Sequence, residues 1–347
     1  MKNYPSFTAI SLIAACTMTA PLCGQGEAAE SSALKHRPAQ KWDVILPSES
    51  WRPVSSLDVP HDGEHGFHAE KDGLSLSVDT NADGVLDKKI KGTKGFLVLK
   101  GKHVDGSALH YGIRVRLAGN RYEYSASGAM TGSVRGVSLK LIDQNNNGIY
   151  NEYGVDAMVV GKSKAACFLS SIVNLKGELY ELSVAEDGQE VTTTPWTGET
   201  GTLNLRKGLR IPGKLRSAVV SSDGHDRAMS FQLAGNPNGL KVPVGSYRLT
   251  GGFAEKGGDT AMLRHGVMEA LEVSHDSVTA PTWGAPLVAE FDFTRDGGEV
   301  TVQPKVRFLG RGGEEWHTLL PDAKSPKLAF YDKKRNKLLA TKRFEGC

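Results

Sequence analysis

The amino-acid sequence predicts a mainly β protein that folds as two antiparallel, sandwich-like domains. Short runs such as "LSLSVD", "HYGIRVRL" and "GVSLKLID" alternate apolar with polar residues, which is the period of a strand with one buried face. Turn residues separate these runs about every ten positions, in keeping with 40 glycines and 15 prolines among 347 residues. That length suits two domains of roughly 100 to 200 residues each.

The first 24 residues are typical of an export signal. Lys2 precedes the apolar stretch "FTAISLIAAC", and small residues follow as far as Gly24. Residues 13–16, "IAAC", also resemble a bacterial lipoprotein signal, in which Cys16 would become the lipid-anchored first residue. No later apolar run approaches the roughly 18 residues of a membrane span. We therefore expect an exported protein that is periplasmic, on the cell surface or extracellular, either soluble or tethered at Cys16.

Changes in sequence texture predict the domain boundaries. Residues 25–42 are polar and lack periodicity, which predicts a disordered leader. We expect the first β domain over 43–207 and the second over 208–347, because Pro212 and Gly213 punctuate the chain there. In the second domain, "VPVGSYRLTGG" resembles the hairpin entry of transthyretin-like or immunoglobulin-like modules, and this resemblance implies the same kind of sandwich.

Further local features of the sequence lead to structural predictions. Asp187-Gly188 predicts a hairpin turn, and residues 325–344 are predicted to form a strand, a polar turn and a return strand. Residues 259–271 are the only helix candidate, with Gly266 interrupting the middle. Cys167 and Cys347 could pair in an oxidising compartment, although the apolar run around Cys167 favours an ordinary buried residue. Lys and Arg exceed Asp and Glu by only three, so no nucleic-acid partner is expected.

Two loops place oxygen-bearing side chains at every second position before a glycine. In "VDTNADGVLD" the candidate ligands are Asp79, Asn81, Asp83, the carbonyl of Val85, and Asp87. In "IDQNNNGIYN" they are, in the same register, Asp143, Asn145, Asn147, the carbonyl of Ile149, and Asn151. Calcium binds six to eight oxygens, and alternate residues of a tight loop supply them together. The first domain is therefore predicted to hold Ca²⁺ at both loops.

Both stretches resemble EF-hand calcium loops over about ten residues. The twelfth position, a glutamate in that family, is Ile90 in the first loop and Gly154 in the second, and strand-like runs replace the flanking helices. The loops are closer to the shorter aspartate-rich calcium loops of secreted β proteins, a resemblance that implies a last ligand from elsewhere. Glu152 and Asp156 are the candidates in the second loop.

Charge predicts which loop binds calcium more tightly. The first loop offers three carboxylates, whereas Asp143 is the only one among the core positions of the second, so we expect the first site to be tighter. Bound ions would stabilise the first domain rather than act as sensors. The competing interpretation is that Asn, Asp and Gly form ordinary turns without metal.

Catalytic patterns are weak. "HDGEH", with His61, His65 and nearby His68, matches an inverted zinc-peptidase pattern, but Pro60, Gly63 and Gly66 oppose the helix it requires. "SSDGHD", residues 221–226, has the composition of a turn. In "FLGRGGEEWHTLLP", Glu314, Glu315 and Trp316 could form a carbohydrate site or simply a hairpin connection over the end of the sandwich.

The leading functional expectation is therefore a calcium-stabilised binding or structural protein of the cell envelope or extracellular space, with a protein or carbohydrate partner. The alternative is a calcium-dependent secreted hydrolase that acts on polysaccharide, with Glu314 and Glu315 as its carboxylates.

Overall fold

The computed structural model describes residues 28–103, 105–224, 227–320, 327–332, 334 and 336–343. Over these residues the chain is mainly β, as predicted, with one 3-10 helix, η1 (Val54–Ser56), and no α-helix. Most strand pairs are antiparallel. The expected export signal with Cys16, and Cys347, which the sequence allowed as an alternative partner for Cys167, lie outside the described residues. Cys167 is a buried free thiol.

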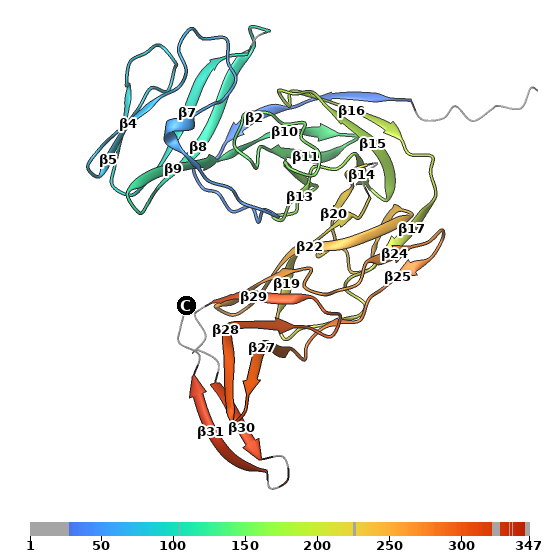
Figure 1. Ribbon diagram of the computed structural model, residues 1–347. Helices are drawn as coiled ribbons and strands as arrows, with labels where there is room; N and C mark the ends of the chain where they lie inside the picture. The colour runs from blue at the N-terminus through green and yellow to red at the C-terminus, as the bar shows by residue number, and fades with distance from the viewer. Residues whose placement is uncertain are drawn as a thin grey trace, which may run out of the picture.

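The N-terminal half contains four sheets (Figure 1). A four-stranded sheet has the order β1 (Glu30–Ala33), β16 (Glu190–Pro195), β15 (Glu178–Val184), β14 (Ile172–Leu175). A five-stranded sheet has the order β13 (Cys167–Phe168), β12 (Ala157–Val160), β11 (Val137–Ile142), β10 (Gly128–Val134), β2 (Lys35–Pro38). A second four-stranded sheet has the order β3 (Arg52–Pro53), β9 (Arg121–Ala126), β8 (Ala108–Ala118), β7 (Lys94–Lys102). A three-stranded sheet has the order β4 (Ala69–Asp72), β5 (Ser75–Val78), β6 (Lys88–Lys91).

The C-terminal half is built around one large sheet. Its order is β20 (Ser230–Gln232), β19 (Lys214–Ser222), β22 (Gly245–Lys256), β23 (Asp259–Arg264), β29 (Glu315–Leu320), β28 (Glu299–Leu309), β27 (Val288–Asp296), with β24 (Leu271–Val273) also on β22. A three-stranded sheet has the order β21 (Leu240–Pro243), β17 (Thr200–Leu203), β25 (Val278–Thr279). Two further strand pairs are formed by β18 (Leu209–Arg210) with β26 (Trp283–Gly284) and by β30 (Lys327–Asp332) with β31 (Lys337–Arg343).

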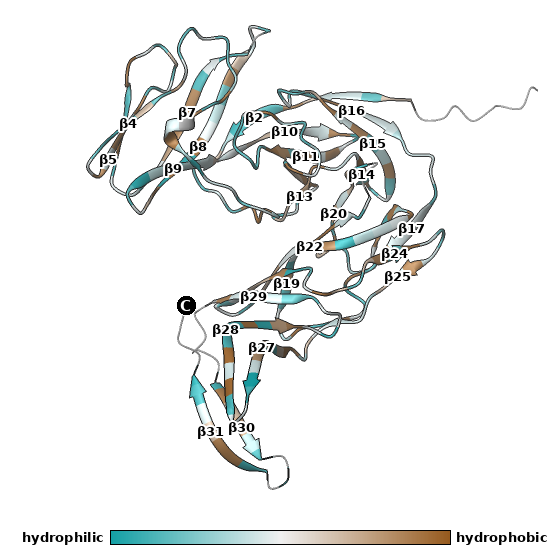
Figure 2. Cartoon of the chain, viewed as in Figure 1, coloured by the Kyte–Doolittle hydropathy of each residue, from teal (hydrophilic) through white to brown (hydrophobic). Residues whose placement is uncertain are grey.

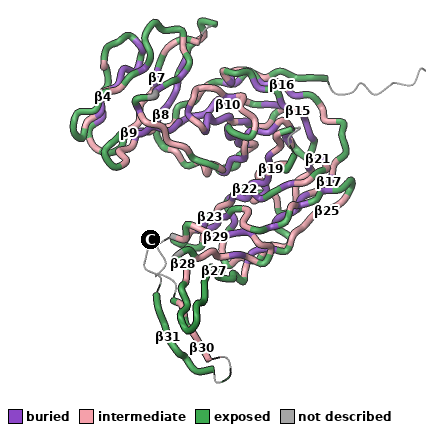
Figure 3. Tube along the Cα trace, viewed as in Figure 1, coloured by how far each residue is buried: buried purple, intermediate pink, exposed green. Residues whose placement is uncertain are grey.

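Buried apolar side chains form two large clusters, one in each half. The first extends from Leu34 to Val191 and is joined by Val219. The second extends from Ile172 to Trp316 and includes Leu203. Strands β14 and β15 contribute to both clusters, so the two cores meet across this part of the chain. Figure 3 shows the buried residues running through both halves, whereas strands β27 and β31 are almost entirely exposed.

The expectation of a disordered leader over 25–42 is wrong for residues 30–38. β1 pairs with β16, and β2 pairs with β10. Leu34, between the two strands, is buried, and its amide donates to the carbonyl of Gln189 at 2.7 Å. Polar composition did not reveal these strands because an edge strand is held by backbone hydrogen bonds and needs few apolar side chains.

The predicted helix over 259–271 is also wrong. Residues 259–264 form β23, which pairs with β22 and β29. Ala261 and Leu263 are buried whereas Met262 between them is exposed, which is strand alternation. Gly266 has φ +61°, and a Cβ there would lie 2.4 Å from the carbonyl oxygen of Gly313. The chain therefore turns where a helix would have continued.

The predicted hairpins are confirmed. β15 and β16 pair across Asp187-Gly188, where Gly188 has φ +70°. β30 and β31 pair as the strand, turn and return strand expected near the C-terminus. Figure 2 shows β31 as an apolar stretch that ends in hydrophilic residues. Local turn chemistry was sufficient in both cases because the partners are close in sequence.

Candidate metal centre

The second acidic loop joins β11 to β12 and buries its first carboxylate. Asp143 is only 1% exposed. Its Oδ1 accepts from the amide of Asn146 at 2.6 Å, and its Oδ2 accepts from the amide of Gly148 and the hydroxyl of Tyr111, each also at 2.6 Å. Burial raises the pKa of Asp143 above its ordinary value, against the effect of these hydrogen bonds.

Asp156 is the last residue of the same loop, directly before β12, and is also 1% exposed. Its Oδ1 accepts from the amide of Gln144 at 3.3 Å, and its Oδ2 from the amide of Glu152 at 3.1 Å. Burial raises the pKa of Asp156 to about 8, and the charge of Asp143 adds to this rise. The donors to both carboxylates are neutral, so two buried acids share one loop without a countercharge among these partners.

The alternating amides lie beside this pair. Asn145 and Asn147 each donate from Nδ2 to Oε2 of Glu152, at 2.7 and 2.6 Å. Within the described residues, Oδ1 of Asn145 is buried and accepts no hydrogen bond. A buried oxygen without a donor is costly, and a cation would satisfy it. Asn151 follows in the loop, half-buried.

The loop backbone is held in a shape that requires glycine at one position. Gly148 has φ +79°, and a Cβ there would lie 2.5 Å from Cδ of Pro60. Asn146, at φ +63°, accepts from the amide of Ala126 at 2.6 Å and donates to the carbonyl of Ser50 at 3.0 Å. Contacts from β9 and from the segment before β3 therefore fix the loop.

The first acidic loop, between β5 and β6, is arranged differently. Asp79 is fully buried and accepts from the amide of Gly84 at 2.9 Å, with Nδ1 of His68 3.6 Å from its Oδ2. Asp87 accepts from the amide of Thr80 at 2.7 Å through Oδ1 and from the Thr80 hydroxyl at 2.8 Å through Oδ2. Both oxygens of Asp87 are therefore used within the loop.

The remaining candidates of the first loop face solvent. Asp83 is exposed and accepts from the amide of Val85 at 2.8 Å and from Nδ2 of Asn81 at 2.8 Å. Val85 is 62% exposed. Asp79 is thus the only fully buried carboxylate of this loop, whereas the second loop brings two together.

The described part of the chain contains no group of three or more His, Cys, Asp or Glu side chains placed to hold a metal ion. A calcium ion at the second loop would therefore depend on amide and main-chain carbonyl oxygens as well as on Asp143 and Asp156. Calcium accepts such ligands, whereas zinc prefers nitrogen and sulfur. The donor set fits a hard cation.

Within the described part of the chain, no helix is long and apolar enough to cross a membrane.

The alternative catalytic carboxylates have structural partners. Glu314 is fully buried and accepts from the amides of Gly284 and Gly312 and from Nε1 of Trp316, at 2.7, 3.1 and 2.9 Å. Glu315 pairs with Arg264 through two hydrogen bonds of 2.9 and 2.7 Å, and this pairing lowers its pKa. Trp316 belongs to the second core and is 7% exposed.

The histidine-rich segment is a loop rather than a helix. His61 accepts from the amide of Gly63 at 2.9 Å through Nδ1 and packs on Phe67. His65 lies beside Gly84 and His68 beside Asp79, so both flank the first acidic loop. This geometry lacks the single helical face of a zinc peptidase. Of the stretch expected to be a turn, Ser221 and Ser222 end strand β19, Asp223 and Gly224 begin the connection to β20, and residues 225 and 226 lie outside the described part.

Comparison of the chain with models of protein families, with curated protein sequences and with solved structures finds no match in any of the three.

The sequence did not identify Tyr111 as a neighbour of the second loop, nor Gln144 and Asn146 as residues of the loop that hold it in place. Tyr111 is 32 positions from Asp143, and no local pattern connects residues that far apart.

Proposed function

We propose that this chain is an exported binding or structural protein of the cell envelope or extracellular space, stabilised by calcium at the loop from Asp143 to Asp156. The observation that carries the proposal is the burial of both carboxylates in one loop, each hydrogen-bonded only by neutral donors in the contacts described above. Burying two acids together is unfavourable without a cation. A divalent ion would offset this cost.

The proposed ligands are the carboxylates of Asp143 and Asp156, the side-chain oxygens of Asn145 and Asn147, and the carbonyl of Ile149, with Glu152 or Asn151 completing the set. The unpartnered Oδ1 of Asn145 supports this assignment. Glu152 already touches both amides. Bound calcium would cross-link β11 and β12 and stabilise the fold by about 2.7 kcal/mol when the free ion is a hundredfold above its Kd.

This proposal places the tighter site at the second loop, although the number of carboxylates in the sequence favours the first. Asp83 is exposed and both oxygens of Asp87 accept from Thr80, so the first loop encloses one carboxylate, that of Asp79, where the second loop encloses two. Weaker binding at the first loop is therefore part of the proposal. The polysaccharide hydrolase gains no support from the geometry, since Glu314 and Glu315 are both engaged in internal contacts.

The test is a thermal melt of the full chain in millimolar calcium and in chelator, repeated for Asp156→Asn and Asp143→Asn. Each substitution removes a carboxylate ligand and should abolish most of the calcium-dependent rise in melting temperature. Asp105→Asn is the matched control, because Asp105 also accepts from a nearby amide but is exposed. Equal melting temperatures of the wild type in calcium and chelator would refute the proposal.

A further inference from the structure

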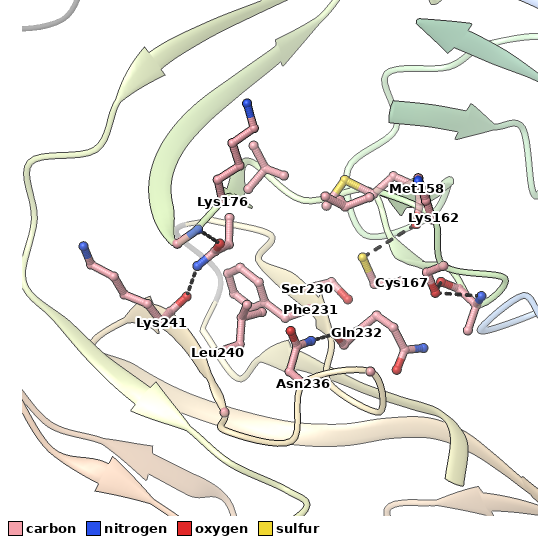
Figure 4. A pocket seen from close by; sticks show the side chains of 18 residues that line it. Met158, Lys162, Cys167, Lys176, Ser230, Phe231, Gln232, Asn236, Leu240 and Lys241 are labelled. Carbon is pink, nitrogen blue, oxygen red and sulfur yellow. Dashed lines mark hydrogen bonds between the residues drawn. The ribbon is translucent and has the colours of Figure 1, made fainter. Parts of the chain in front are cut away.

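A cavity of about 600 Å³ lies where the two cores approach each other, and Figure 4 shows its lining. Met158 of β12 and Cys167 of β13 line it from the first core. Phe231 of β20 and Leu240 of β21 line it from the second half. Its size is in the range of small-molecule sites, which concentrate at junctions of this kind. It is far larger than the space of one buried water.

The lining combines apolar and polar side chains. The apolar side chains are those of Met158, Val160, Ala165, Cys167, Val173, Phe231 and Leu240. Uncharged polar side chains come from Ser163, Asn174, Ser230, Gln232 and Asn236. Many of these polar groups bond internally: Nδ2 of Asn174 donates to the carbonyl of Lys241 at 2.9 Å, and Nδ2 of Asn236 to that of Gln232 at 3.1 Å. The apolar part of the lining therefore suits a ligand with an apolar body rather than a polyhydroxylated one.

The charged residues of this lining are Lys162, Lys176 and Lys241, and its described residues include no acid. This bias is local, because acidic and basic residues are nearly balanced over the whole chain. Lys241 pairs with Glu178 at 3.0 Å, and Nζ of Lys176 donates to the carbonyl of Arg135 at 3.0 Å. Neither Glu178 nor Arg135 belongs to the lining, and Figure 4 shows the ammonium groups of Lys176 and Lys241 pointing away from the cavity. Lys162 is exposed at the rim.

We propose that the cavity between the two cores binds a small anionic amphiphile, with its apolar body against the partly buried Val160 and Leu240 and its carboxylate or phosphate beside the exposed rim lysine Lys162. An ammonium group attracts either anion as a point charge. The inference is independent of the proposed calcium site, since the lining includes none of the proposed calcium ligands.

The site offers a clean blocking variant. Gly235 belongs to the lining, its φ is not positive, and a Cβ there would meet nothing within 4 Å. Gly235→Trp therefore adds bulk at the cavity with little backbone strain. Gly258 has the same open surroundings but lies outside the lining, so Gly258→Trp is the matched control. Lys162→Glu tests the charge, and Lys207→Glu is its exposed control away from the cavity.

The experiment measures displacement of 1-anilinonaphthalene-8-sulfonate from the full chain, in calcium throughout, by octanoate, octyl phosphate, octanol and octyltrimethylammonium. We expect the two anions to compete. Gly235→Trp should weaken them by about tenfold or more, and Lys162→Glu should weaken them by several-fold without affecting octanol. The ratio of octanoate to octyl phosphate affinity then distinguishes a carboxylate from a phosphate ligand. No competition up to millimolar ligand, equal binding of octyltrimethylammonium and the two anions, or wild-type affinity in Gly235→Trp would each overturn the proposal.

A second measurement locates the ligand. Cys167 lies in the wall, and burial raises the pKa of its thiol to about 12, so its modification depends on access. In the Cys347→Ser chain, octanoate should slow the alkylation of Cys167 by N-ethylmaleimide, as followed by peptide mass spectrometry. Unchanged alkylation at saturating octanoate would place the ligand elsewhere and overturn the assignment.

Discussion

The hydroxyl of Tyr111, on β8, donates a hydrogen bond of 2.6 Å to Oδ2 of Asp143, and both residues are buried. This bond joins one sheet to the acidic loop of another. It also gives a buried carboxylate one of its few side-chain donors. The strength of this bond should therefore depend on whether a cation shares the carboxylate.

Removing the donor tests this relationship. Tyr111→Phe should destabilise the fold by about 1.5 to 3 kcal/mol in chelator, the range for a hydrogen bond to a charged group. The cost should be smaller in calcium, because the ion also stabilises Asp143. Urea denaturation in each condition measures both values. Tyr122→Phe is the control, since the Tyr122 hydroxyl donates to the carbonyl of Gly92, outside the loop. A Tyr111→Phe cost that calcium does not change would contradict this account.

Stability in chelator should fall as the pH rises through about 8. The pKa of Asp156 is raised to about 8 in the folded protein, whereas an unfolded aspartate titrates near about 3.9. An acid with a raised folded pKa contributes stability that is complete below its unfolded pKa and is lost as the pH rises through its folded pKa. Free energies of unfolding measured from about pH 5 to about pH 9 should show this loss. Asp156→Asn should flatten it, and a slope retained in that variant would assign the effect to another group.

His36 should act in the opposite pH window. Burial lowers the pKa of His36 to about 4, helped by the nearby His110 and His103. Its Nδ1 is buried without a hydrogen-bond partner in the described structure, and its ring stacks on Tyr111. A base with a lowered folded pKa loses its contribution as the pH falls from about 6.5 towards about 4. His36→Phe should reduce this acid sensitivity in the same denaturation series, whereas exposed His275→Asn should leave it unchanged. If wild type and His36→Phe lost the same stability as the pH falls, His36 would not be the residue responsible for the acid sensitivity.

Gly148→Ala should be strongly destabilising. At φ +79° an alanine is strained by about 1 to 2 kcal/mol, and its Cβ would also meet Pro60 at 2.5 Å. Gly73→Ala isolates the first cost, because Gly73 has φ +56° and open space around it. The difference between the two variants in urea denaturation should be about 2 kcal/mol or more. Equal costs would show that the loop moves away from Pro60 freely.

The local character of the chain could be read from its sequence. Alternating runs and turn residues predicted a mainly β fold and the hairpin at Asp187-Gly188, because strand period and turn chemistry act over a few residues. The register of Asp143, Asn145 and Asn147 likewise predicted that these side chains would lie in one loop, and the structure places them there with Asp156.

Tertiary structure alone decided the rest. Residues 30–38 became strands because β16 and β10 offered open edges, and 259–264 became a strand because β22 and β29 lie on either side. The sequence showed carboxylates in both acidic loops, but burial by distant strands made the second loop the one with two enclosed acids. The cavity between the cores also exists only after folding, since its walls come from strands far apart in the chain. Burial and edge pairing depend on residues that are distant in the chain, and a short stretch of sequence does not show which distant residues will pack against it.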